Sequence, residues 1–178
     1  CYFAFTTGYR HEKSKYGPLV VVSSRDNGRT LVSWMTLPGF SDRGIQHASG
    51  GPMGAGRVGF LVSAVDESDV VTTHFIYTDD IAASSPVWTE ASVTTSDGFF
   101  VNGPMLALPA AEGGHETLGF RWYGHSAGRI RVVSTVDNGA NFTDTTIAAK
   151  PTGKTLVEPF AGLLSNGTYL VVIRDDDG

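Results

Sequence analysis

The chain has little cysteine, few basic residues and no long apolar run. Cys1 is the single cysteine among 178 residues, so an internal disulfide is excluded, and no Cys/His spacing typical of a metal site is present. No stretch of about 18 apolar residues occurs, which excludes a membrane-spanning helix. Lysine and arginine number 13 against 18 acidic residues and form no cluster, so nucleic acid is not an expected partner. We expect neither a metal nor an organic cofactor.

No leader peptide is visible in the sequence. The chain begins with Cys1 rather than methionine, and no basic and apolar leader follows it. It stops at Gly178, directly after a strong strand pattern. We therefore expect the sequence to be an internal segment of a longer polypeptide.

Short apolar runs, rich in Val, Ile, Phe and Thr, recur along the chain. They are bounded by Gly, Asn, Asp and Ser, and no segment keeps a helical period over ten residues. Runs of four to six residues with such boundaries are typical of β-strands. The runs are residues 19–22, 58–62, 73–77, 118–122, 130–133 and 169–173. The sequence therefore predicts an all-β fold.

The strands follow an internal repeat. Residues 20–28 and 131–139 share one pattern: an apolar strand, two hydroxyl residues, a spacer and Asp-Asn-Gly. Their aspartates, Asp26 and Asp137, are 111 residues apart, and Asp80 in a degenerate copy divides this interval into 54 and 57. A unit of about 55 residues with four short strands has the size of a β-propeller blade.

The repeat divides the chain into blades. We predict about three four-stranded blades at residues 1–43, 44–97 and 98–155, and the start of another at residues 156–178. Propellers typically close with four to eight blades. Either a further part of the protein or another chain is therefore expected to complete the ring.

Two of the repeated turns resemble a known motif. Residues 135–142 resemble the Asp box of sialidases, Ser/Thr-x-Asp-x-Gly-x-x-aromatic, and residues 24–31 match it except that Leu31 replaces the aromatic residue. This resemblance implies a sialidase-type propeller, with six blades in the whole protein, in which the box is a fold element of the outer surface. A generic Asn-Gly hairpin turn is the alternative explanation.

Residues 157–174 resemble the sialidase segment in which Glu-Pro and a final Arg enclose two apolar strands. In that family the Glu assists a tyrosine nucleophile and the Arg is one of three that hold the substrate carboxylate, which implies catalytic roles for Glu158 and Arg174. Spacing alone predicts a hairpin, because both residues lie eight positions from Asn166 of the Asn166-Gly167 turn. A plain cross-strand ion pair, worth about 0.2–1 kcal/mol, is the alternative.

Equivalent positions in the preceding blades give further candidates. Steps of about one blade from Glu158 reach Asn102 and His47, and a similar step from Arg174 reaches Arg121. Equivalent positions of a propeller gather around one end of its channel, so we predict that these residues bind substrate. Trp122 and Tyr123, which follow Arg121, join them. Each of these side chains could instead point between blades or into solvent.

Two other tryptophans have a different expectation. We predict that Trp34 and Trp88 pack in the core or between blades.

The resemblance implies a glycoside hydrolase that cleaves sialic acid linkages. It fits an exosialidase, or a bacteriophage tailspike endosialidase that depolymerises polysialic acid as a trimer, and hence an extracellular or virion-associated protein. The remaining catalytic residues of the family are expected outside residues 1–178. Two alternatives stay open: a non-catalytic Asp-box propeller that binds glycan or protein, and a glycosidase of another Asp-box family.

Overall fold

The structure is a computed structural model that describes residues 2–6, 19–31, 33–36, 43–95, 99–109, 115–123, 127–152 and 155–176. Within these ranges the chain forms thirteen β-strands and one short 3-10 turn, Gly54–Gly56. The all-β prediction is confirmed, since the described residues contain no α-helix.

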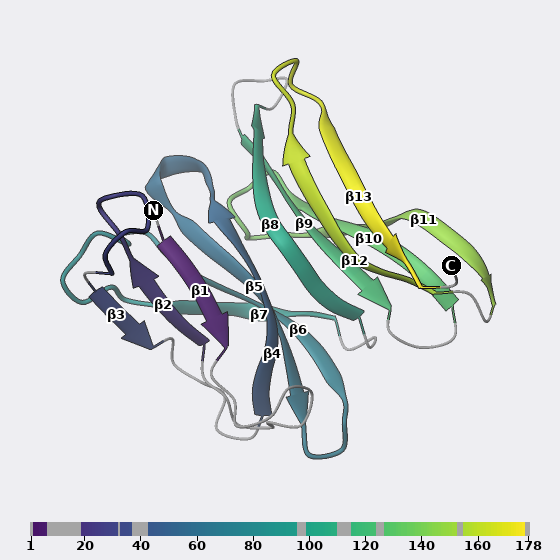
Figure 1. The fold of residues 1–178 in the computed structure, drawn as a ribbon. Coiled ribbons are helices and arrows are strands. Elements are labelled where there is room, and N and C mark those ends of the chain that lie inside the picture. Colours follow the sequence, from purple (N-terminus) through teal and green to yellow (C-terminus); the bar gives the residue numbers. More distant parts are fainter. Residues whose placement is uncertain are drawn as a thin grey trace.

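The strands form four antiparallel sheets in chain order (Figure 1). In every sheet each strand pairs with the one that precedes or follows it along the chain. The first sheet contains β1 (Tyr2–Thr6), β2 (Leu19–Ser23) and β3 (Ser33–Thr36); the second contains β4 (Arg43–Pro52), β5 (Val58–Asp66), β6 (Val71–Thr78) and β7 (Thr89–Thr95); the third contains β8 (Phe99–Pro109), β9 (His115–Tyr123), β10 (Ala127–Thr135) and β11 (Thr143–Thr152); the fourth contains β12 (Leu156–Leu163) and β13 (Tyr169–Asp175).

The middle strands of the second sheet are buried on both faces. In β5, Phe60 and Val62 pack with Leu19 of the first sheet, whereas Leu61 packs with Val101 and other residues of the third sheet. Because alternate side chains of a strand point to opposite faces, a strand between two sheets must be apolar at nearly every position. This is the reason for the continuous apolar runs in the sequence.

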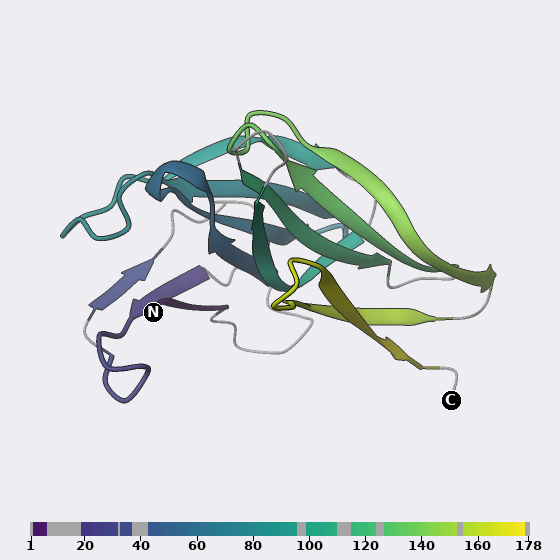
Figure 2. The same ribbon diagram turned by 90° about the horizontal axis from the view of Figure 1, so that it is seen from above.

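The third and fourth sheets pack in the same way. Phe120 of β9 and Ala161 of β12 are fully buried against each other, with Val171 of β13 beside them. Phe160 and Val172 lie on the other face of the β12–β13 sheet and are exposed. The four sheets follow one another in an arc from β1 to β13 (Figure 2).

Trp88 packs as predicted. Its ring lies 5.8 Å from that of Phe60, against the core between the first two sheets. Trp34 lies in β3, but its side chain is outside the described residues.

The turn after β2 is closed by its own side chains. Asp26 Oδ1 accepts hydrogen bonds from the Thr30 amide and the Ser24 hydroxyl, each at 2.8 Å, and the Gly28 amide donates to Ser24 Oγ at 2.7 Å. Asn27 and Gly28 have left-handed backbones, with φ of 59° and 89°. The Thr30 hydroxyl donates to Asp26 Oδ2 at 2.7 Å. This bond, first, and then those from the Thr30 amide and the Ser24 hydroxyl lower the pKa of Asp26 to about 2.

The turn after β10 repeats this geometry. Asp137 Oδ1 accepts from the Asn141 amide and the Thr135 hydroxyl at 2.8 Å, and the Gly139 amide donates to Thr135 Oγ1 at 2.9 Å. The left-handed φ angles of Asn138 and Gly139 are 56° and 89°. Hydrogen bonds from Asn141 lower the pKa of Asp137 below its ordinary value. We call these two turns the Asp turns.

The degenerate copy after β6 keeps only part of the Asp-turn pattern. The Asp80 amide lies 3.3 Å from Thr78 Oγ1, and Asp80 Oδ1 accepts from the Ala82 amide at 3.1 Å. It has no Asn-Gly pair in the left-handed region.

An arginine joins the second and third sheets beside these turns. Arg57 binds both carboxylate oxygens of Asp79, at 2.7 and 3.3 Å, and donates to the Asn138 carbonyl at 2.6 Å. Its guanidinium carbon lies 3.9 Å from the centre of the Tyr77 ring. The turn after β10 is thereby held against the neighbouring sheet.

Candidate functional site

The predicted hairpin is formed by β12 and β13. At its turn the Gly167 amide donates to the Leu164 carbonyl at 3.0 Å, and the Leu164 amide donates to the Thr168 carbonyl at 2.7 Å. Gly167 has φ of 83°, a conformation that glycine adopts at little cost. The turn brings the ends of the hairpin that carry Glu158 and Arg174 together.

A bulge interrupts the hairpin at Glu158. Val157 pairs with Arg174, and Phe160 pairs with Val172. Two residues of β12, Glu158 and Pro159, therefore face one residue of β13, Ile173. Such bulges bend a strand and redirect its side chains. Glu158 has φ of 49°, which is unfavourable for a residue with a Cβ and doubly so before proline, which favours an extended predecessor.

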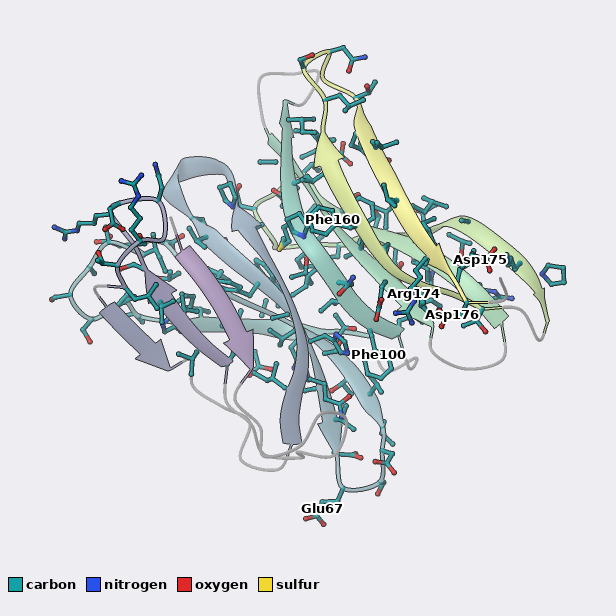
Figure 3. The ribbon with its side chains drawn as sticks, in the orientation of Figure 1. Glu67, Phe100, Phe160, Arg174, Asp175 and Asp176 are labelled. Atoms are coloured by element: carbon teal, nitrogen blue, oxygen red, sulfur yellow. The ribbon has the colours of Figure 1, made fainter. Side chains whose placement is uncertain are left out.

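Arg174 is shared by two carboxylates. Its Nη1 lies 2.6 Å from Glu158 Oε2. Its Nε and Nη2 bind Asp176 at 2.7 and 3.1 Å, and Figure 3 shows Arg174 and Asp176 near the end of β13. Asp176, first, and then Glu158 raise the pKa of Arg174, which stays fully charged. The side chains of Arg174, Glu158 and Asp176 are 54%, 43% and 41% exposed, respectively. Because Nε and Nη2 both bind Asp176, the guanidinium presents two donors to one carboxylate as a fork. Arginine binds carboxylate ligands with the same geometry.

Asn102 of the neighbouring strand reaches this bulge. Its Nδ2 donates to the Pro159 carbonyl at 3.2 Å. The next residue, Gly103, is left-handed with φ of 72°, and a Cβ built there would lie 3.1 Å from the same carbonyl. Gly103 is followed by Pro104 as Glu158 is by Pro159, so each of the two contacting bulges, on β8 and on β12, contains a residue before proline.

His47 lies one strand further along. β4 also has a register shift, between Ile45 and His47, and the His47 ring contacts Phe100 of β8 with the ring centres 5.2 Å apart. Phe100 is two residues from Asn102. The structure thus connects the three strands in turn: His47 of β4 contacts Phe100 of β8, and Asn102 of β8 contacts Pro159, the residue after Glu158 on β12.

Arg121 occupies the place on β9 that Arg174 occupies on β13. It pairs with Val101 of β8, as Arg174 pairs with Val157 of β12. Trp122 and Tyr123 follow it in the strand. The side chains of these three residues are outside the described part of the chain, so their roles stay predictions.

Sequence reasoning missed two parts of this arrangement. Asp176 lies in the acidic stretch after β13, and only its two-residue spacing from Arg174 could have indicated the pairing. The second part is the contact of Asn102 with the Pro159 carbonyl. The sequence feature that could have indicated this contact is that residues 103–104 and 158–159 both end in proline.

The described residues include no group of three or more His, Cys, Asp or Glu side chains placed to hold a metal ion. Nor do they include a helix with the length and hydropathy of a membrane span.

Comparison with known proteins gives likeness in fold at low sequence identity. No protein-family model matches the chain, and no curated protein does. A Dyadobacter fermentans protein of unknown function aligns with a TM-score of 0.64 and 16% identity, over 96% of this chain and 52% of its own. The Hadza microbial sialidase Hz136 aligns with a TM-score of 0.60 and 15% identity, over 97% of this chain and 36% of its own. An ulvan lyase of a new polysaccharide lyase family, PL25, aligns with a TM-score of 0.50 and 12% identity, over 99% of this chain and 59% of its own.

These alignments establish the fold class. The sheets are arranged as the blades of a sialidase-type β-propeller, as predicted. The chain spans about half the length of the first of these structures and about a third of the sialidase. The fold is one that carbohydrate-processing enzymes use.

Proposed function

We propose that this protein is a glycoside hydrolase that cleaves sialic acid linkages, with Glu158 and Arg174 in its active site. The observation that carries the proposal is their 2.6 Å contact at a bulge where Glu158 has a left-handed backbone. A strained backbone of this kind costs about 1–3 kcal/mol and is found preferentially at functional sites. A plain surface ion pair does not require it.

The proposed chemistry needs both groups. Hydrolysis of a glycosidic bond passes through a state with oxocarbenium character. A sialoside carries a carboxylate beside the reacting carbon, and Arg174 would bind it through a guanidinium fork. Glu158 would accept a proton from the nucleophile or stabilise the developing positive charge. The likeness in fold to a sialidase supports the same class of substrate.

Asp176 has a definite place in this proposal. It binds the Nε and Nη2 fork of Arg174. The substrate carboxylate would take over the fork and displace Asp176. We also propose that the Asp turns are Asp boxes of the sialidase kind, which would make them elements of the scaffold and not of the site.

The test is release of sialic acid from sialyllactose and from polysialic acid by the full-length protein. We expect Glu158→Gln to lower kcat by at least about 100-fold, the usual effect of losing a positioned acid/base group. Arg174→Lys keeps the charge but loses the fork, so kcat/KM should also fall. Asp175→Asn is the matched control, because Asp175 is a neighbouring exposed carboxylate that pairs with Lys150 instead.

Other outcomes would favour the alternatives. Cleavage of a neutral glycan that does not depend on Arg174 would indicate another glycosidase. Glycan binding without any cleavage would indicate a non-catalytic propeller, which the shared fold also allows.

A further inference from the structure

We propose that Asn102 is a positioning residue for Glu158 and makes no contact with the substrate itself. This inference rests on the proposed function, and it replaces the substrate-binding role that the sequence predicts for Asn102. It starts from the 3.2 Å hydrogen bond between Asn102 Nδ2 and the Pro159 carbonyl.

The bulge at Glu158 needs an external restraint. Its φ of 49° lies outside the regions that favour a residue with a side chain, and a residue before proline tends toward extended conformations. Pro159 has no N–H, so it can take part in the hydrogen bonding of the bulge only through its carbonyl. If Glu158 relaxed to an extended backbone, its side chain would turn away from Arg174.

Asn102 supplies that restraint from the adjacent strand. Its amide binds the carbonyl of the residue directly after Glu158. Gly103 allows the two strands to approach, since the Cβ of any other residue would lie 3.1 Å from the Pro159 carbonyl and 3.4 Å from the Phe160 Cα. Asn102 is itself half-buried and lies in β8, opposite Phe120, a fully buried residue. The restraint is therefore anchored in the core.

A positioning role and a contact role predict different kinetics. A positioning residue affects the rate of the chemical step, because a displacement of about 1 Å at a reacting group can lower the rate roughly 100-fold. Substrate affinity would change little, since Arg174 still holds the carboxylate. A residue that binds ground state and transition state equally would instead raise KM and leave kcat unchanged.

The experiment compares three variants in the full-length protein. Asn102→Ala removes the donor, and Asn102→Asp keeps the shape but sets a carboxylate oxygen against the Pro159 carbonyl. Gly103→Ala disturbs the same bulge without touching the amide. Ser134→Ala is the control, because Ser134 also loses one hydrogen bond, 2.7 Å to Thr143, on strands away from the bulge.

We expect each of the three variants to lower kcat by roughly 10- to 100-fold with KM changed less than twofold. Ser134→Ala should leave both unchanged. Circular dichroism checks that each variant is folded. A variant that does not fold is left out, and the other two are compared with the wild type.

A rise in KM at constant kcat would overturn the proposal and restore the contact role. Normal kinetics in both Asn102 variants would overturn it as well. Failure of the proposed function has a different signature: Glu158→Gln would then cleave sialosides as fast as the wild type, or the wild type would not cleave them.

Discussion

Two glycines of similar backbone conformation give a sharp test of how the sheets pack. Gly139 lies in the Asp turn after β10 and Gly167 in the β12–β13 turn, with φ of 89° and 83°. A Cβ at Gly139 would lie 2.3 Å from Cε1 of the buried Phe75, whereas a Cβ at Gly167 would meet nothing within 4 Å. Alanine at either position therefore has the same backbone cost, but only Gly139→Ala forces a neighbouring sheet to move.

The magnitudes follow from these distances. A left-handed alanine costs about 1–2 kcal/mol, which is the whole effect expected for Gly167→Ala. Overpacking in a tight core adds about 1–3 kcal/mol at Gly139. Phe75 has little room to yield, because it is fully buried and packs against Tyr77 and Phe142 with ring centres 5.5 and 5.1 Å apart.

Urea unfolding of the full-length protein and its two variants measures the difference. We expect the free energy of unfolding of Gly139→Ala to lie about 1–3 kcal/mol below that of Gly167→Ala, with equal m values. Equal destabilisation of the two variants would instead show that Phe75 does not pack on the turn and that the second and third sheets do not meet there.

Three further predictions concern stability. Arg57→Lys should lower the free energy of unfolding by about 1 kcal/mol in urea titrations, because lysine cannot bind both oxygens of Asp79; an unchanged midpoint would contradict this. Asp26 and Asp137 have pKa values lowered in the folded state, to about 2 for Asp26, so their stabilisation is present above about pH 4 and lost as the pH falls toward 2. Replacing both with asparagine should flatten the stability–pH curve in that window. Glu158→Gly should change the free energy of unfolding by less than about 1 kcal/mol. Glycine adopts the left-handed backbone without strain, and this gain offsets the loss of the ion pair with Arg174 and the greater flexibility of glycine in the unfolded chain. Sialic acid release should nevertheless fall at least about 100-fold.

The fold was predictable because its signals are local. Apolar strands buried on both faces and Asn-Gly turns are visible within a few residues of sequence. The Asp turns repeat because Asp26 and Asp137 each close their own turn with neighbours in the chain. The β12–β13 hairpin was predictable for the same reason, through Asn166 and Gly167.

The details of the candidate site were less predictable because they depend on contacts between strands. Counting residues matched Glu158 with Asn102, but the left-handed residue before proline on β8 is Gly103. The bulges differ in length: three residues between Asn102 and Leu106 of β8 face one residue of β9, whereas two residues between Val157 and Phe160 of β12 face one residue of β13. A sequence period cannot place residues across bulges of unequal length. The hydrogen bond from Asn102 to the Pro159 carbonyl is likewise invisible until the strands are neighbours.

The most direct test of the central claim is a crystal structure of the full-length protein with an unsaturated sialic acid analogue whose flattened ring mimics the transition state. We predict that the ligand carboxylate lies about 3 Å from the guanidinium of Arg174, that Asp176 has left the Nε and Nη2 fork, and that Glu158 faces the anomeric carbon. A ligand bound elsewhere on the propeller, with the contacts among Glu158, Arg174 and Asp176 unchanged, would contradict it.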